Sequence, residues 1–308
     1  MKKKLLHLFT AFTLLITSGC ALPGLAGSAE NTIRIGTLGT AESEILGEML
    51  SIMIERETDL NTELVTQLGS SILQHQGMTT DDLDITATRY TGTDLAGALG
   101  MDPVTDPDKA MNIVQREFQQ RFDQTWAKSY GFENSYSVAV TKEFAKEKGI
   151  ETISDLEPYA VEMRFGVDNA WVNRKGDGYD GFKKTYFSFG EVYPMSVGLV
   201  YEAVASGHMD AVLAYSSDGR INEYDLKVLK DDRRFFPPYD ASPVIRNEVL
   251  KEHPQIRDIT EKLAGTISTE KMQELNYLVD VKLQSPEKVA RQFLEEHDYF
   301  EGSRGEDS

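Results

Sequence analysis

The chain runs TIRIGTLGTAESEILGEMLSIMI over residues 32–54, and this stretch decides the fold. Residues 32–36 alternate as a short strand does, and residues 43–55 carry apolar side chains at helical spacing. The pattern continues with a strand, a helix and a third strand, at residues 63–68, 70–83 and 84–90. This β-α-β-α-β order predicts an α/β fold with a mostly parallel sheet that helices cover.

A second α/β series follows a helix expected at residues 106–122. Gly149 should end the first helix of this series, and Ser154 should cap the next one. The other strands and helices of the series are expected at residues 136–141, 142–148, 164–168, 196–206 and 210–215. From about Ser242 the chain is expected to be largely helical, with Ser285 as the cap of the last helix.

Two α/β series of similar size, followed by a helical section, predict two lobes. We expect lobe 1 to comprise residues 32–134 and 241–308, and lobe 2 to comprise residues 135–240. Ligands of open α/β sheets bind at the carboxyl ends of strands, and often between domains. The candidate ligand site is therefore a cleft between the lobes.

The N-terminus has the features of a secretory signal. Three lysines at residues 2–4 precede an apolar run at residues 5–16, which is shorter than the roughly 20 residues of a bilayer span. Cys20, the only cysteine, follows Ser-Gly where bacterial lipoproteins carry their diacylated cysteine. We expect a lipoprotein signal peptide at residues 1–19, a tether at 20–31, and an anchor through Cys20 on the extracellular face of the cell membrane. The alternative is an ordinary signal peptide with an incidental cysteine.

Composition narrows the possible partners. The formal net charge is −18, and it becomes about −21 (−18 − 3) without residues 1–19, which hold three lysines and no acidic residue. Such an acidic chain argues against nucleic acid and against wide contact with anionic lipid. A single cysteine cannot form an internal disulfide, and the histidines lack H-x-x-x-H spacing, so no metal or cofactor is expected.

Four tyrosines stand where the expected strands begin or end. Tyr90 and Tyr215 each close a strand, and Tyr136 opens the second series. Tyr239 follows Phe-Phe-Pro-Pro where the chain would return to lobe 1. Taken singly, each tyrosine is compatible with an ordinary core or rim aromatic, so position alone does not make them a site.

Four segments together carry a resemblance to a known family. They are DITATRYTGTD (84–94), GVDNAW (166–171), DAVLAYSSDGR (210–220) and RFFPPYD (234–240). In these segments the chain resembles the osmoprotectant-binding subunits of ABC transporters for glycine betaine, carnitine and choline in Gram-positive bacteria, and the resemblance extends over essentially the whole chain. It implies a two-lobed class II periplasmic-binding-protein fold with the ligand in the cleft between the lobes. It also implies a membrane permease with a cytoplasmic ATPase as partner.

The resemblance further implies a cage of four tyrosines, matching Tyr90, Tyr136, Tyr215 and Tyr239, around the quaternary-ammonium group of the ligand. Such a group is a cation without an N–H to donate. Aromatic faces offer it negative potential and apolar contact together, each worth about 0.5–2 kcal/mol. Tyrosine suits this task because its hydroxyl can bond elsewhere while the ring faces the cation.

The groups that would hold a ligand carboxylate are less defined. Arg174 resembles an arginine that related betaine binders use, and a guanidinium suits a carboxylate. Thr93 matches a position where threonine accompanies broad specificity and aspartate accompanies restriction to choline. Some relatives place a polar residue where this chain has Leu38, so Thr37, Thr40 or backbone N–H groups of the following helix would have to replace it.

Other functions remain as alternatives. A lipid-anchored extracellular hydrolase would need a nucleophile and a base in the cleft, yet no G-x-S-x-G or Walker motif occurs. Gly176-Asp177-Gly178 lies outside the strand-to-helix context that a nucleotide-binding glycine loop needs. A binding protein for another small ligand and a sensory lobe are further candidates. Glu42 and Glu44 stand at a helix start, where acidic residues usually favour the helix dipole. The sequence therefore predicts a transport receptor rather than an enzyme.

Overall fold

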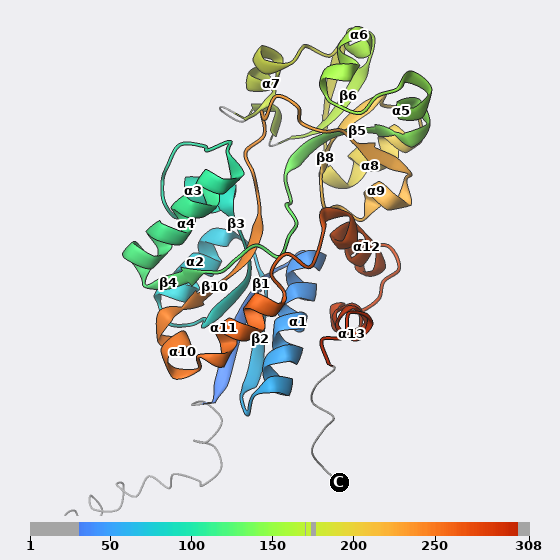
Figure 1. Ribbon diagram of the computed structural model, residues 1–308. Helices are drawn as coiled ribbons and strands as arrows, with labels where there is room; N and C mark the ends of the chain where they lie inside the picture. The colour runs from blue at the N-terminus through green and yellow to red at the C-terminus, as the bar shows by residue number, and fades with distance from the viewer. Residues whose placement is uncertain (1–30, 170, 174–176, 301–308) are drawn as a thin grey trace, which may run out of the picture.

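The computed structural model describes residues 31–169, 171–173 and 177–300. It consists of two α/β lobes, one above the other in Figure 1, with two stretches of chain passing between them. Cys20 and Arg174 lie outside the described residues. Within the described ranges, no helix combines the length and the apolar character that a membrane crossing requires.

The first sheet, in the lower lobe of Figure 1, has the strand order β2-β1-β3-β10-β4. Its strands are β1 (Thr32–Leu38), β2 (Asn61–Leu68), β3 (Ile85–Tyr90), β4 (Gln124–Trp126) and β10 (Ala241–Arg246). β1, β2 and β3 are parallel, whereas β10 runs antiparallel to both of its neighbours. The helices between these strands are α1 (Ala41–Glu57), α2 (Ser71–Thr79), α3 (Thr91–Ala96) and α4 (Pro107–Phe122).

The second sheet has the order β7-β6-β8-β5-β9. Its strands are β5 (Tyr136–Thr141), β6 (Arg164–Asp168), β7 (Glu191–Met195), β8 (Ala211–Tyr215) and β9 (Leu226–Val228). β6 is parallel to β7 and β8, and β5 is antiparallel to β8 and β9. The helical segments of this lobe are α5 (Lys142–Lys148), η1 (Ser154–Leu156), α6 (Glu157–Ala160), η2 (Trp171–Asn173), α7 (Tyr179–Thr185), α8 (Val197–Ala205) and α9 (Arg220–Glu223).

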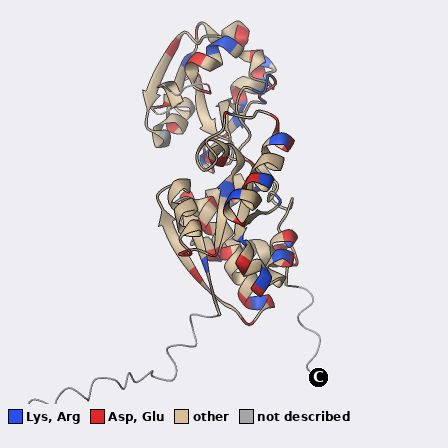
Figure 2. Ribbon diagram, turned by 90° about the vertical axis from the view of Figure 1, so that its left-hand side faces the viewer, with Lys and Arg blue, Asp and Glu red and all other residues tan. Residues whose placement is uncertain are grey.

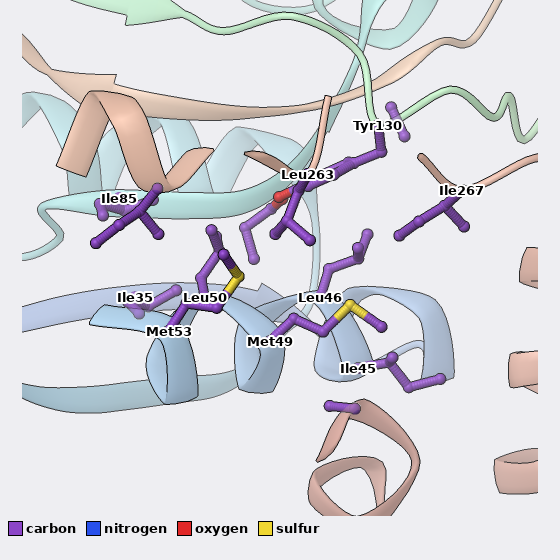
Figure 3. Close-up of a cluster of buried hydrophobic side chains, with 14 of the residues drawn as sticks. Ile35, Ile45, Leu46, Met49, Leu50, Met53, Ile85, Tyr130, Leu263 and Ile267 are labelled. Carbon is purple, nitrogen blue, oxygen red and sulfur yellow. The ribbon is translucent and has the colours of Figure 1, made fainter. Parts of the chain in front are cut away.

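Four C-terminal helices return to the first lobe. They are α10 (Asn247–Glu252), α11 (Gln255–Lys262), α12 (Thr269–Asp280) and α13 (Pro286–Glu296), of which α11, α12 and α13 pack against α1. Figure 3 shows Leu46, Met49 and Leu50 of α1 packed between the sheet and this C-terminal region. α12 also touches the other lobe, since a Cβ on Gly219 would lie 2.4 Å from the backbone nitrogen of Tyr277.

Several sequence expectations are confirmed. Gly149 adopts the left-handed conformation (φ 72°) that ends α5. Ser285 caps α13, where its Oγ accepts a hydrogen bond from the backbone N–H of Lys288, and Pro286 is the first helical residue. The two-lobed α/β architecture is confirmed as well, so local signals identified most of the helices and the buried strands.

The expected, mostly parallel sheet is confirmed, although β10 in the first sheet and β5 in the second run against the other four strands. Other expectations were wrong. Residues 241–246 form the interior strand β10, in a section expected to be largely helical. Ser154 is the first residue of η1 rather than a cap, because Ile153 occupies the capping position without a side-chain hydrogen bond. The strands β4, β7 and β9 were not anticipated, since each is a short strand at the edge of its sheet and leaves little periodic pattern.

Candidate functional site

Tyr90 and Tyr239 form a pair in the first lobe. Tyr90 ends β3 opposite Ala241 of β10, which places Tyr239 beside the start of α3. A Cβ on Gly92 would lie 3.1 Å from the Tyr239 ring and 2.8 Å from the carbonyl oxygen of Pro238, so only glycine allows this close approach. Both tyrosines are 8% exposed and belong to one apolar cluster.

Tyr136 and Tyr215 form a second pair in the other lobe. They face each other directly across β5 and β8, with ring centroids 5.0 Å apart and a tilt of 36°. The Tyr215 hydroxyl donates to the Tyr136 hydroxyl over 3.4 Å. The Tyr136 ring also lies 6.2 Å from Phe236 and 6.5 Å from Trp171, so an aromatic cluster supports this pair.

The two pairs lie beside the stretches of chain that join the lobes. The backbone N–H of Asn134, two residues before Tyr136, donates to the carbonyl oxygen of Tyr239 over 3.1 Å. The backbones of Glu133 and Asp240 form an isolated antiparallel β-bridge between the outgoing and returning stretches. Burial raises the pKa of Asp240 to about 6, and repulsion from Glu133 adds to this effect. The structure thus brings the four predicted tyrosines to the junction of the lobes, two on each side.

A pocket of about 440 Å³ opens at this junction. It is lined from both lobes and from α12, by Gly39, Thr40, Ala41, Glu42, Asn134, Tyr215, Ser217, Asp218, Arg220, Asn276 and Asp280. The charge of Arg220 is satisfied within the pocket, since its Nε donates to Asp218 over 2.9 Å. Burial, and then repulsion from Asp218, raises the pKa of Asp280. The pocket is polar, with charged groups from both lobes.

Tyr136 lines another pocket, of about 480 Å³, on the side of the second sheet that faces the start of α12. A wider recess of about 830 Å³ lies between Pro103 and Thr105 of the first lobe and Arg234 of the second. Tyr215 and Tyr136 therefore line two different pockets at the junction.

The other predicted residues have varied surroundings. Thr93 is half-buried in the first turn of α3. Leu38 packs against the core of the first lobe, and its backbone N–H donates to Ser43 Oγ over 2.8 Å. Thr37 is fully buried, whereas Thr40 lines the 440 Å³ pocket at the start of α1. Of Thr37, Leu38 and Thr40, only Thr40 lines this pocket.

Glu42, for which the sequence predicts only a helix-dipole role, lies at the centre of a hydrogen-bond network. Its side chain is 2% exposed and accepts hydrogen bonds from four side chains. The donors are the Tyr90 hydroxyl, Asn134 Nδ2 at 2.5 Å, Ser217 Oγ at 2.6 Å and Asn276 Nδ2 at 3.3 Å. These donors lie from 48 to 234 residues away along the chain, so no local pattern could have revealed the network.

The surface and the described side chains show no grouping typical of a metal enzyme. Acidic and basic residues are interspersed on the helices of both lobes (Figure 2). Among the described residues, no three His, Cys, Asp or Glu side chains come close enough together to hold a metal ion.

Comparison with known proteins identifies the family. The OpuAC model, described as the substrate-binding domain of an ABC-type glycine betaine transport system, matches residues 31–296. The chain belongs to this family. Its members are binding proteins of transport systems and not enzymes, so the chain is the substrate-binding component of an ABC importer and acts outside the cytoplasm.

Similar proteins cover nearly the whole chain. The carnitine transport binding protein OpuCC of Listeria monocytogenes is 50% identical over 306 residues, which is 98% of this chain and 99% of the relative. A glycine-betaine-binding protein of Pseudomonas aeruginosa is 32% identical, over 92% of this chain and 94% of its own. A crystal structure of a glycine betaine/carnitine/choline ABC transporter protein aligns with a TM-score of 0.85 at 50% identity, covering 87% of this chain and 99% of that chain. The two-lobed fold is therefore shared with solved relatives.

Proposed function

We propose that this protein captures quaternary-ammonium osmoprotectants, such as carnitine, glycine betaine and choline, and delivers them to an ABC permease driven by a cytoplasmic ATPase. The observation that carries the proposal is the placement of two tyrosine pairs, one in each lobe, at the junction of the lobes. Several aromatic faces around one site suit a cation that cannot donate a hydrogen bond.

In this proposal the ligand bridges the lobes. Tyr90 contacts the ammonium group from lobe 1, at residues 32–134 and 241–308, and Tyr136 and Tyr215 contact it from lobe 2, at residues 135–240. Tyr239, at the end of the stretch that returns from lobe 2, packs with Tyr90 in the core of the first lobe and contacts the ligand from that side. A ligand that touches both lobes stabilises the closed arrangement more than the open one, because only the closed form offers all four rings. Closure then provides the signal that the permease recognises.

The carboxylate of a betaine needs donors near the cage. Thr40 and the backbone N–H groups at the start of α1 line the pocket beside Tyr215 and supply neutral donors. Thr93 and Arg174 are the remaining candidates. We propose that Thr40 takes the part that a polar residue at position 38 would have, because Leu38 packs into the core.

The protein is further proposed to be held on the outer face of the cell membrane by a lipid on Cys20, with residues 20–31 as the tether. In cell fractionation, we expect the unaltered chain to stay in the membrane fraction and the Cys20→Ala variant to be released from it.

The experiment that tests the ligand class is isothermal titration of the purified protein with carnitine, glycine betaine, choline and unmethylated glycine. Ergothioneine is a useful addition, because a 35% identical ergothioneine transport protein of Helicobacter pylori matches 86% of this chain and 48% of its own length. Saturable binding of trimethylated ligands without binding of glycine is expected. Binding of none of them would overturn the proposal and favour another cleft ligand or a hydrolase.

A further inference from the structure

The buried carboxylate of Glu42 lines the 440 Å³ pocket and contacts the proposed cage through the Tyr90 hydroxyl. It lies in the first turn of α1, and the Tyr90 hydroxyl donates to its Oε1 atom. Its two oxygens also accept from Asn134 in the outgoing stretch, Ser217 after β8 and Asn276 in α12. One side chain therefore connects both lobes, the chain between them and the C-terminal helices.

This arrangement is more than a favourable place for an acidic residue. A buried carboxylate is costly unless donors surround it, and here four side chains are oriented to do so. Asn134 and Asn276 both turn their amide nitrogens toward Glu42, which leaves each Oδ1 atom without a hydrogen-bond partner in the described chain. The surroundings are therefore built to satisfy a negative charge at this position.

The hydrogen bond fixes the Tyr90 ring. Burial, and next the negative charge of Glu42, raises the pKa of Tyr90 well above its ordinary value, so the phenol keeps its proton and donates it. A phenol that donates to a carboxylate gains electron density in its ring, and the attraction between an aromatic face and a cation depends on that density.

We propose that Glu42 is a positioning residue for ligand binding: it holds the Tyr90 ring toward the cleft and ties it to Ser217 of the opposite lobe. The effect of Glu42 on ligand affinity rests on the proposed function, whereas its effect on the position of the Tyr90 ring does not. A purely structural Glu42 would stabilise the fold without acting through the Tyr90 hydroxyl.

The first test needs no ligand. The Tyr90 signal in ¹³Cζ-tyrosine NMR spectra, assigned by its loss in Tyr90→Phe, is expected to move toward that of a free phenol in Glu42→Gln. Glu44→Gln is the matched control, because it removes the same charge from the same helical turn. An unmoved Tyr90 signal in Glu42→Gln overturns the proposal.

The second test measures affinity. Glu42→Gln is expected to weaken glycine betaine binding about tenfold, as loss of a hydrogen bond to a charged group does, while Glu44→Gln stays within about twofold. In a Tyr90→Phe background, Glu42→Gln should cause no further loss, since the contact is already absent. Additive losses, or equal losses in Glu42→Gln and Glu44→Gln, contradict the proposal.

Two further outcomes, a Glu42→Gln variant that does not fold and an unaltered protein that binds no ligand, still allow the proposal to be tested. If Glu42→Gln does not fold, Tyr90→Phe removes the same hydrogen bond from its other side and should give the same tenfold loss, about that expected for a charged hydrogen bond. If the unaltered protein binds no trimethylated ligand, the proposed function fails, but the NMR comparison still decides whether Glu42 positions the ring.

Discussion

The two tyrosine pairs are held in different ways. In the first lobe, the hydroxyl of Tyr90 donates to a buried carboxylate that also receives bonds from three other segments. In the second lobe, Tyr136 and Tyr215 bond to each other over 3.4 Å, and Phe236 and Trp171 pack against Tyr136. Tyr90 thus depends on a charged network, and the second pair depends on aromatic packing.

The atoms that stabilise the tyrosines therefore differ between the two lobes. Where packing holds a tyrosine ring, burial of the ring's apolar area contributes most of the stabilising free energy. Where a carboxylate accepts from the tyrosine hydroxyl, that hydrogen bond contributes a large part of it. Ring deletions should therefore be most damaging in the second lobe, and hydroxyl deletions should be most damaging in the first.

The largest expected effect is that of Tyr136→Ala. It removes one proposed cage ring together with the support of Tyr215, so glycine betaine affinity should fall by about 2 kcal/mol, or roughly thirtyfold. Loss of a buried aromatic ring should also lower the free energy of unfolding by about 3 kcal/mol. Titration and urea unfolding measure the two quantities, and unchanged affinity in a folded variant would remove Tyr136 from the site.

The next effect compares two single oxygen atoms. Tyr90→Phe leaves Glu42 with one donor fewer and should reduce the free energy of unfolding by about 1.5 kcal/mol, because the acceptor is charged and buried. Tyr215→Phe removes a long bond between two neutral hydroxyls and should cost less, about 0.5 kcal/mol. Urea unfolding of both variants provides the comparison, and a reversed order would refute the assigned difference between the pairs.

The smallest effect concerns the chain between the pairs. Because the pKa of Asp240 is raised to about 6, its proton stabilises the folded state: the contribution is fully present below the unfolded value near 3.9 and is lost as pH rises through 6. The Asp240→Asn side chain stays neutral at both pH values. The free energy of unfolding of the variant, compared with that of the unaltered chain, should therefore be about 1 kcal/mol higher at pH 7 than at pH 5, after allowance for solvent screening. Urea unfolding at both pH values measures this difference. An equal change in the free energy of unfolding between pH 5 and pH 7 for the variant and the unaltered chain would contradict the prediction.

Sequence patterns predicted the parts of the fold that have local causes. Helices such as α4 and α13 were located by apolar spacing and caps, and the confirmed family membership followed from four segments far apart in the chain. Strand β10 was missed because Ser242 and Pro243 interrupt its apolar run and the strand is stabilised by pairing with β3 and β4.

The candidate site was only partly accessible from sequence. The four tyrosines could be named by resemblance, and the structure places them at the junction of the lobes, although their role stays a prediction. Glu42 could not be distinguished from Glu44, since both are acidic residues in the same helical turn. What separates them is a set of donors up to 234 residues away, which only the folded chain brings together.

The central claim is that aromatic faces recognise the positive charge of the ligand. Isothermal titration should compare glycine betaine with 3,3-dimethylbutanoate, in which carbon replaces the nitrogen and the shape is kept. We expect at least about a hundredfold weaker binding of this analogue, which keeps the carboxylate but lacks the positive charge, because the cation–π attraction of several rings is lost. Equal affinity for the two compounds would show that shape and carboxylate contacts suffice, and would contradict the cage.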